Sequence, residues 1–330
     1  MKRAFKWIGG LLLVALIALF AIGYTPDTDP TAMRAKYTNK ASQFVDVGGG
    51  LTMHVRDEGN RDGPVLVLLH GSNASLHTWE PWVARLGAKY RIISVDQIGH
   101  GLTGPNPAGQ YDGAAFVGTL DALLTKLGVS RFALAGNSMG GYVAWEYALA
   151  HPGKLTQLVL VDAGGPPDDP NKKLPIGFRI ARTPGLNKIA LLITPRSIFE
   201  KSMHGSVSNH AVVTPAMINR YWELNRYPGN RKATGDRFAQ YAKRDTNTGR
   251  LGEIKVPTLI LWGDQDKLIP VSGADWFAAR IPGSAKIVYP GIGHIPMEEA
   301  PDQSAKDLDA FLSNPFPSSP KPPSITPAKP

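Results

Sequence analysis

The sequence predicts an α/β fold in which a mainly parallel sheet is covered by helices on both faces. Short apolar runs that suit strands buried on both faces alternate along the chain with stretches of helical periodicity. One interval of about 90 residues breaks this alternation and has helical patterns of its own. That interval is too long for a loop, so we expect a helical lid inserted after the sixth strand.

The N-terminal segment, residues 1–26, is expected to lie outside this fold. Met1–Lys6 carries three positive charges, and the 20 residues of Trp7–Pro26 carry none. As a helix rising about 1.5 Å per residue, that run matches the roughly 30 Å hydrocarbon core of a bilayer. Basic residues before the run orient the remaining chain outside the cytoplasm, in the periplasm if the source is bacterial. We therefore predict a membrane anchor. The alternative is a signal peptide cleaved near Ala21-Ile22-Gly23, which would give a secreted protein.

The predicted core covers residues 40–165 and 256–313. It begins with a hairpin over residues 43–58, which turns at three consecutive glycines. Six apolar runs predict buried strands, over residues 65–69, 91–95, 132–135, 158–161, 258–262 and 285–289. Helices are expected over residues 114–127, 139–150 and 272–281. Functional residues of such sheets collect at the carboxyl ends of the strands, and the residues that follow these runs are His70, Asp96, Ser138, Asp162 and Asp266.

The predicted lid covers residues 166–255. Helical stretches are expected over residues 178–193, 217–227 and 237–242. The segment holds 16 Lys/Arg against 7 Asp/Glu. Such an excess of positive charge either attracts anionic substrates or simply coats solvated helix surfaces. Beyond the core, residues 314–330 contain seven prolines and predict a disordered tail.

The composition excludes several kinds of site. The chain of 330 residues has no cysteine, which rules out disulfides and thiolate chemistry. Its eight histidines show no metal-ligand spacing, so we expect no metal and no cofactor. No aromatic-basic motif accompanies the positive charge, so nucleic-acid binding is not expected. No obligate protein partner is implied.

A nucleophile is predicted at Ser138. The stretch Gly136-Asn137-Ser138-Met139-Gly140-Gly141 fits Gly-x-Ser-x-Gly, after a predicted strand and before a predicted helix. Glycines two residues before and after the serine remove side chains that would clash in the sharp turn that exposes its Oγ. A serine hydroxyl also needs a base and an orienting acid. Asp266 follows the 258–262 run and His294 follows the 285–289 run, which gives the chain order Ser, Asp, His.

From about Gln43 to Ser313 the chain resembles the α/β-hydrolase superfamily. The likeness rests on four motifs in chain order: His70-Gly71-Ser72, Asp96-Gln97-Ile98-Gly99-His100-Gly101, the Gly-x-Ser-x-Gly turn around Ser138, which we call the elbow, and Gly293-His294. The chain is most similar to the lid-bearing branch of esterases, meta-cleavage-product C–C hydrolases, epoxide hydrolases and haloalkane dehalogenases. The motifs indicate the superfamily and not the substrate.

The resemblance implies a role for each site residue. Ser138 is the nucleophile, His294 the general base and then acid, and Asp266 the orienting carboxylate. Asp266 is selected by the family's Gly-x-x-Asp spacing from Gly263; Asp264 is the second choice, and Asp162 is a more distant one. Backbone N–H groups of Ser72 and Met139 are expected to form the oxyanion hole, whose donors are each worth roughly 3–4 kcal/mol in the transition state.

A serine at the elbow implies an acyl intermediate, unlike the aspartate used by the dehalogenases and epoxide hydrolases of this branch. The sequence therefore predicts a serine hydrolase that acts on a carboxylic ester or a related small-molecule acyl substrate. A C–C bond hydrolase of the meta-cleavage type and an acyltransferase use the same residues and stay open. From a different class, an inactive hydrolase fold used as a binding module is a further alternative.

Overall fold

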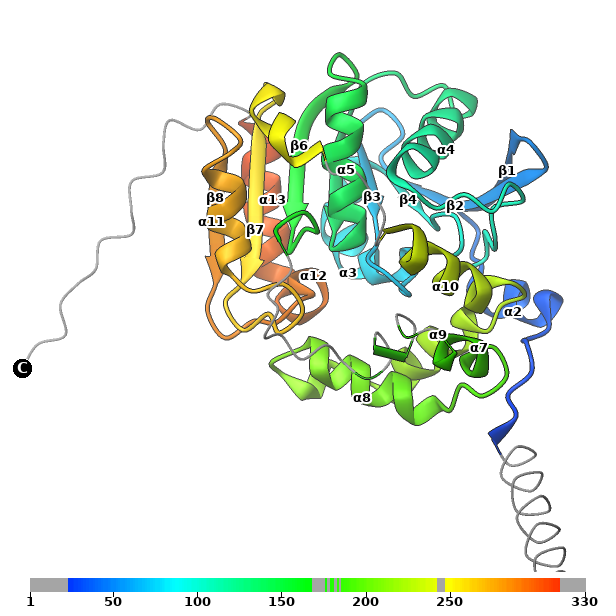
Figure 1. Cartoon of the computed structure of the whole chain (residues 1–330). Coiled ribbons are helices and arrows are strands. Elements are labelled where there is room, and N and C mark those ends of the chain that lie inside the picture. Colours follow the sequence, from blue (N-terminus) through cyan, green and yellow to red (C-terminus); the bar gives the residue numbers. More distant parts are fainter. Residues whose placement is uncertain are drawn as a thin grey trace, which may run out of the picture.

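The computed structural model contains an eight-stranded sheet with strand order β1-β2-β4-β3-β5-β6-β7-β8 (Figure 1). It describes residues 23–167, 176, 179–180, 183, 185–241 and 247–314. β1 (Ser42–Gly48) and β2 (Leu51–Gly59) form the predicted hairpin, and β2 pairs antiparallel with β4 (Arg91–Val95). The other strands pair in parallel: β3 (Val65–Leu69), β5 (Phe132–Asn137), β6 (Leu155–Val161), β7 (Thr258–Gly263) and β8 (Ala285–Tyr289). The predicted fold class is confirmed.

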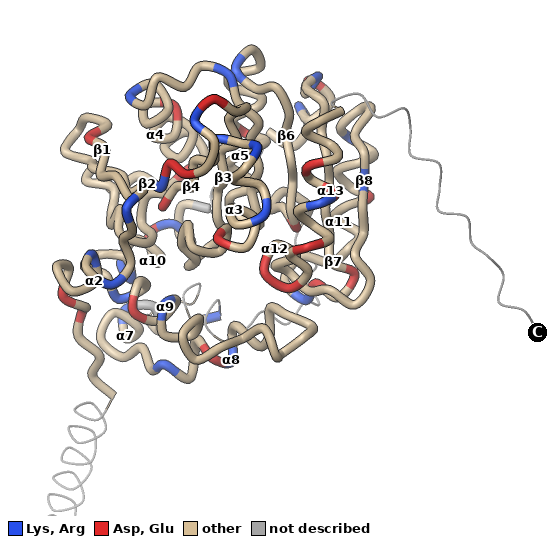
Figure 2. Tube along the Cα trace, turned by 180° about the vertical axis from the view of Figure 1, so that it is seen from behind, with Lys and Arg blue, Asp and Glu red and all other residues tan. Residues whose placement is uncertain are grey.

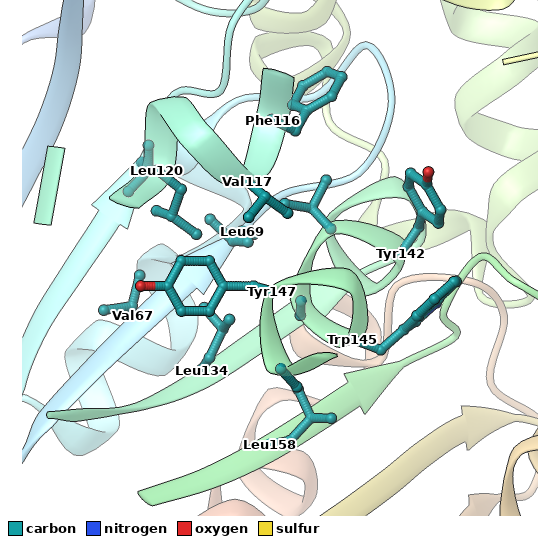
Figure 3. Packing of buried hydrophobic residues seen from close by; sticks show 14 of the residues in the cluster. Val67, Leu69, Phe116, Val117, Leu120, Leu134, Tyr142, Trp145, Tyr147 and Leu158 are labelled. Atoms are coloured by element: carbon teal, nitrogen blue, oxygen red, sulfur yellow. The ribbon is translucent and has the colours of Figure 1, made fainter. Parts of the chain in front are cut away.

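Two hydrophobic cores lie on the two faces of the sheet, because successive strand side chains point to opposite sides. One face is covered by α4 (Gly113–Lys126), α5 (Met139–Ala150) and α11 (Ser272–Ala278). Figure 3 shows this core, with Tyr147 of α5 over Leu134 of β5. The other face is covered by α3 (Glu80–Leu86) and α13 (Pro301–Ser313). A rigid sheet buried on both sides fixes the strand ends that carry the predicted site.

Several helices were not expected from the sequence. They include α3 and α13, together with the short elements η1 (Leu76–Trp79) and α12 (Pro296–Glu299). Trp82 of α3 donates a hydrogen bond to Ser304 of α13 at 2.9 Å, which joins the two helices on the same face. The strand predictions are more accurate, and β6 differs most, because it begins three residues before the predicted run at residue 158.

The described part of the segment between β6 and β7 is mainly helical, and we call residues 166–255 the insertion. Its described elements are α7 (Leu186–Ala190), α8 (Arg196–Ser206), η2 (His210–Val212), α9 (Pro215–Asn225), α10 (Asn230–Tyr241) and η3 (Asn247–Glu253). Of the expected helix over residues 178–193, residues 178, 181, 182 and 184 lie outside the described residues, and the described part includes α7. α8 was not predicted, and α10 begins well before the expected residue 237. Acidic residues lie beside basic ones on α8 and α9 (Figure 2), and Arg196 pairs with Glu200 within α8 at 3.2 Å. That the insertion acts as a lid stays a prediction.

The N-terminal segment packs against the insertion, and we call residues 23–37 the strap. Thr25 N donates to Leu192 O at 2.8 Å, and Thr28 N donates to Arg226 O at 2.9 Å. The strap ends in α2 (Pro30–Tyr37), whose first turn is capped by the Asp29 side chain, which accepts a hydrogen bond from Ala32 N.

The predicted membrane anchor over residues 1–26 is corrected by this arrangement. The final residues of the expected span bind the folded domain, since Arg226 donates to Pro26 O at 3.1 Å and Arg231 donates to Thr25 O at 2.7 Å. Across the residues that the structure describes, there is no helix with the length and apolarity needed to cross a bilayer. We therefore withdraw the anchor and the extracytoplasmic location drawn from it. Residues 1–22 lie outside the described residues, as does nearly all of the predicted tail over residues 314–330.

Candidate active site

Ser138 stands on a strained turn between β5 and α5. Its backbone angles, φ 56° and ψ −116°, lie in a region that residues other than glycine rarely adopt. Backbone strain of this kind in a native structure is typically found at functional sites. The neighbouring chain holds it there: Ser138 N donates to Val161 O at 3.0 Å, and Gly164 N donates to Ser138 O at 2.8 Å. A Cβ at Gly140 would collide with Leu69 O, so the turn requires glycine there. This is the geometry that the elbow motif predicted.

His294 and Asp266 form a buried pair. His294 Nδ1 lies 2.7 Å from Asp266 Oδ2, with the two residues 4% and 7% exposed. Asp266 Oδ1 accepts hydrogen bonds from Leu268 N at 2.7 Å and Ile269 N at 3.0 Å. The carboxylate is thereby fixed by donors on both oxygens. Since a carboxylate only accepts, Nδ1 carries the proton and Nε2 is left as the basic nitrogen.

The two other candidate acids have different partners. Asp264 Oδ1 accepts a hydrogen bond from Gly291 N at 2.7 Å, which stabilises the loop before the histidine. Asp162 is fully buried, and its Oδ1 accepts from Gly263 N at 3.0 Å. Burial and the neighbouring Asp266 raise the pKa of Asp162 well above its usual value, which favours the neutral acid. Of the three carboxylates, Asp266 is the one in contact with His294.

The loop after β3 approaches Ser138 closely. A Cβ at Gly71 would lie 3.2 Å from Ser138 Cβ and 2.9 Å from Asn137 Oδ1, so a larger residue there would have to displace these side chains. The next residue, Ser72, and Ser138 line the same cavity. Met139 is the first residue of α5, where backbone N–H groups have no partner within the helix. Ser72 and Met139 are therefore both placed beside Ser138.

Asp96 and His70 stabilise the loop after β3, although neither residue lines the cavity. Asp96 accepts hydrogen bonds from Leu76 N at 2.8 Å and Leu102 N at 2.9 Å, so it joins two loops. His70 is fully buried, with Nδ1 2.7 Å from Gly71 O and Nε2 accepting from Gln97 N at 3.1 Å. Burial lowers the pKa of His70, in keeping with a neutral ring.

The cavity beside Ser138 has mostly apolar walls. The loop after β3 and the segments of Ser138 and His294 form one side, and the insertion supplies much of the other. Its apolar lining residues are Ala74, Ile180, Ala190, Ile193, Ile198, Phe199, Met203, Leu268 and Ile295. Arg231 is the single Lys or Arg among the described lining residues, and its guanidinium is paired with Asp27 of the strap at 2.6 Å. The site therefore suits an uncharged, apolar group next to the serine.

Asp162, Asp266 and His294 are also close enough to share a metal ion, since their ligand atoms lie within 4.8 Å of one another. However, His294 Nδ1 and both oxygens of Asp266 are already engaged in hydrogen bonds inside the protein. This donor set fits a proton-carrying pair better than a metal site.

Comparison with known proteins identifies the family. The model of the family described as alpha/beta hydrolase fold matches residues 64–301, which is well over half of the chain. The chain belongs to this family. Curated relatives include Lipase 1 of Psychrobacter immobilis, which is 27% identical and aligns over 92% of this chain and 96% of its own. A 2-hydroxy-6-oxononadienedioate/2-hydroxy-6-oxononatrienedioate hydrolase of a Pseudomonas species is 27% identical over 83% of this chain and 97% of its own.

Solved structures give the same result. The crystal structure of a membrane phospholipase A, titled a novel bacterial virulence factor, superposes with a TM-score of 0.73 at 26% identity. It covers 96% of this hydrolase and 99% of the other chain. The family relationship and these relatives establish the protein as an α/β-hydrolase enzyme.

Sequence reasoning missed some residues of this hydrolase's site. Asn137, the variable residue of the Gly-x-Ser-x-Gly motif, donates to His294 O at 3.0 Å and so links the segment of Ser138 to that of His294. The insertion side chains that face the cavity were also missed, because the apolar spacing of α8 is interrupted by polar residues. For Asn137 a signal was available in its position next to the serine.

Proposed function

We propose that this α/β-hydrolase cleaves carboxylic esters through an acyl-enzyme on Ser138. The observation that carries the proposal is that the strained Ser138 lines one apolar cavity together with His294, which is hydrogen-bonded to Asp266. Neither the serine nor the pair would be sufficient alone, because the hydroxyl needs a base and the imidazole needs its tautomer fixed.

In the first half of the reaction, His294 Nε2 takes the proton of Ser138 Oγ as Oγ bonds to the ester carbonyl carbon. The carbonyl π electrons move to oxygen, which becomes the oxyanion. Asp266 Oδ2 accepts the Nδ1–H bond throughout and stabilises the imidazolium. The oxyanion then reforms the carbonyl and the C–O bond to the alcohol breaks, with His294 donating the proton to the leaving alkoxide.

In the second half, His294 takes a proton from water as the water oxygen attacks the acyl carbon. Collapse of the second tetrahedral intermediate returns the proton to Ser138 Oγ and releases the acid. Each tetrahedral intermediate places its oxyanion toward the N–H groups of Ser72 and Met139. Donors that are already fixed before the reaction stabilise this charge without reorganisation.

The lining supports an ester with an apolar acyl or alkyl group. The names of two relatives, a lipase and a phospholipase A, agree with such a substrate. A C–C hydrolase of the meta-cleavage type, the activity named for another relative, acts on an anionic dienoate and would need a free cationic group in the cavity. Arg231, the lining cation in the described part of the chain, is held by Asp27. The ester is therefore the better supported substrate.

The test compares full-length wild type, Ser138→Ala and Ser272→Ala on p-nitrophenyl esters of increasing chain length, with fluorophosphonate labelling of each. Ser272 is an exposed serine at the start of α11 that does not line the cavity, and it serves as the matched control. We expect Ser138→Ala to lose labelling and to lower kcat on the order of a millionfold. Labelling without ester turnover would favour C–C hydrolysis or acyl transfer, and a folded wild type that is not labelled would contradict the proposal.

A further inference from the structure

Arg237 of α10 is a buried cation that reaches from the insertion to the active-site loops. It is 4% exposed. One terminal nitrogen lies 2.6 Å from His100 Nε2 and donates to Met139 Sδ at 2.9 Å. The other donates to Asn73 Oδ1 at 3.1 Å. The guanidinium thus contacts a side chain from each of the two segments that flank Ser138.

The hydrogen bonds of His100 show which of its two ring nitrogens carries the proton. His100 Nδ1 lies 2.9 Å from Ile98 O, an acceptor, so Nδ1 holds the proton and donates it there. Nε2 is consequently unprotonated, and its lone pair accepts a hydrogen bond from Arg237. Burial, followed by the charge of Arg237, keeps the pKa of His100 well below its usual value, consistent with a neutral acceptor. Arg237 is therefore held as the donor in this pair.

Asn73 is held by two residues of the same helix. Thr234 Oγ1 donates to Asn73 Oδ1 at 3.0 Å, and Thr234 lies three residues before Arg237, on the same face of α10. Asn73 has a φ of 59°, in the left-handed region, and it directly follows Ser72. The loop that presents Ser72 N–H is thus kept in an unusual conformation by contacts from the insertion.

The charge of Arg237 lacks a carboxylate partner in the described residues, where its contacts are an imidazole, a thioether, an amide and the ring of Phe238. Burying a cation without an anion is costly, and burial lowers the pKa of Arg237 to about 9. Neighbouring insertion arginines differ, since Arg231 and Arg196 each pair with a carboxylate. A buried positive charge beside the oxyanion hole gains a counter-charge when the tetrahedral intermediate forms.

On the basis of the proposed function, we infer that Arg237 is a positioning residue for the oxyanion hole. It fixes the Ser72 loop through Asn73 and the Met139 segment through the Met139 side chain. Its charge adds to the field that stabilises the oxyanion, which is strong at low dielectric. Because Arg237 belongs to α10, the oxyanion hole is complete only while the insertion is docked.

The test measures kcat and KM of full-length Arg237→Gln and Arg237→Lys on one p-nitrophenyl ester, with the rate of fluorophosphonate labelling. Losing one oxyanion donor costs about 10²–10³ in kcat, and Arg237 acts through such donors, so we expect Arg237→Gln to lower kcat about 10- to 100-fold. KM should change far less, because the cation does not line the cavity. Lysine keeps the charge without the forked geometry, so Arg237→Lys should recover part of kcat.

Arg226→Gln is the matched control, because it removes another mostly buried insertion arginine, whose contacts are Pro26 O and the Trp222 ring. It should change the thermal midpoint without a selective loss of kcat. A folded Arg237→Gln with kcat within about twofold of wild type overturns the inference. If Arg237→Gln does not fold, Arg237→Lys decides: wild-type kcat in that variant overturns the positioning role. A wild type that is neither labelled nor active contradicts the proposed function itself.

Discussion

At the scale of single residues, the three carboxylates proposed as partners of His294 differ in what they contact. Asp266 accepts from His294 and two backbone amides, Asp264 stabilises a loop, and the pKa of Asp162 is raised by burial. The environment of each side chain, and not its residue type, therefore distinguishes the carboxylate that orients His294 from a neutral carboxylic acid.

We expect Asp266→Asn to lower kcat by about 10⁴, since an amide cannot hold the same imidazole tautomer. Asp162→Asn should cost at most a few-fold, because an amide reproduces a neutral acid that accepts from Gly263 N. Asp264→Asn should behave like Asp162→Asn. Steady-state kinetics of the three isosteric variants test this, and a larger loss for Asp162→Asn than for Asp266→Asn would reverse the assignment.

Ser138, His294 and Asp266 could be found in the sequence because each follows an apolar run in a fixed chain order. Arg237 could not. The insertion has 16 Lys/Arg, and neither periodicity nor spacing tells which guanidinium is buried. Its direction depends on how α10 docks on the loops, which is a property of tertiary packing.

At the scale of elements, the elbow shows how closely β5, α5 and β3 pack. A Cβ at Gly140 would collide with Leu69 O of β3, whereas a Cβ at Gly118 of α4 would meet nothing within 4 Å. Gly118 can therefore accept a larger side chain and Gly140 cannot, although both glycines lie in helices.

We predict that Gly140→Ala destabilises the protein by several kcal/mol, because the backbones of α5 and β3 must separate. Gly118→Ala should instead stabilise it by about 0.5–1 kcal/mol through helix propensity. Chemical denaturation of both variants provides the comparison. Equal effects of the two substitutions would mean that the elbow is less tightly packed than described.

The prediction for the start of the strap is wrong, because the apolar run before it is typical of a membrane-spanning helix and the predicted anchor extends to residue 26. The local signals for α2 were present, with Asp29 as the N-cap and Pro30 in the first turn. They were not sufficient, since α2 is stabilised by distant residues: Met33 and Tyr37 are buried in a cluster with Leu102, Leu224 and Tyr227. By contrast, the strands were predictable because each is a local apolar run.

A chain that starts at residue 38 should have a thermal midpoint roughly 5–10 °C below one that starts at residue 23, because Met33 and Tyr37 lose their burial. Its ester KM should also rise, since Arg231 in the cavity wall loses Thr25 O and Asp27. Asp27→Asn removes only the partly exposed ion pair and should shift the midpoint little. Equal midpoints for the two chain lengths would contradict a structural role for the strap.

At the scale of the whole molecule, buried neutral histidines contribute to the loss of stability in acid. Burial lowers the pKa of His70, His77 and His100, and for His77 the value falls to about 4, with a further contribution from Arg56. A histidine in the unfolded chain has a pKa near 6.5, so the unfolded state binds more protons between these values. Stability is therefore lost as pH falls from about 6.5 toward 4.

For His77 alone, this difference amounts to about 3 kcal/mol between pH 7 and pH 4. We expect His77→Gln to flatten the pH dependence of the unfolding free energy by about that amount, whatever it costs at pH 7. Urea denaturation at several pH values measures the slope. A variant with an unchanged slope would show that His77 is protonated in the native state.

The strand order has a consequence for how new substrate ranges arise. Because β6 and β7 are neighbours in the sheet, the insertion leaves and re-enters at adjacent points, and exchanging it need not disturb any strand pairing. The strap, however, is sequence-distant yet hydrogen-bonded to the insertion and paired with a cavity arginine. A chimera that transplants residues 166–255 alone would leave these contacts without partners. A chimera that transplants residues 23–37 together with residues 166–255 keeps the contacts between them and should be more stable than one that transplants residues 166–255 alone.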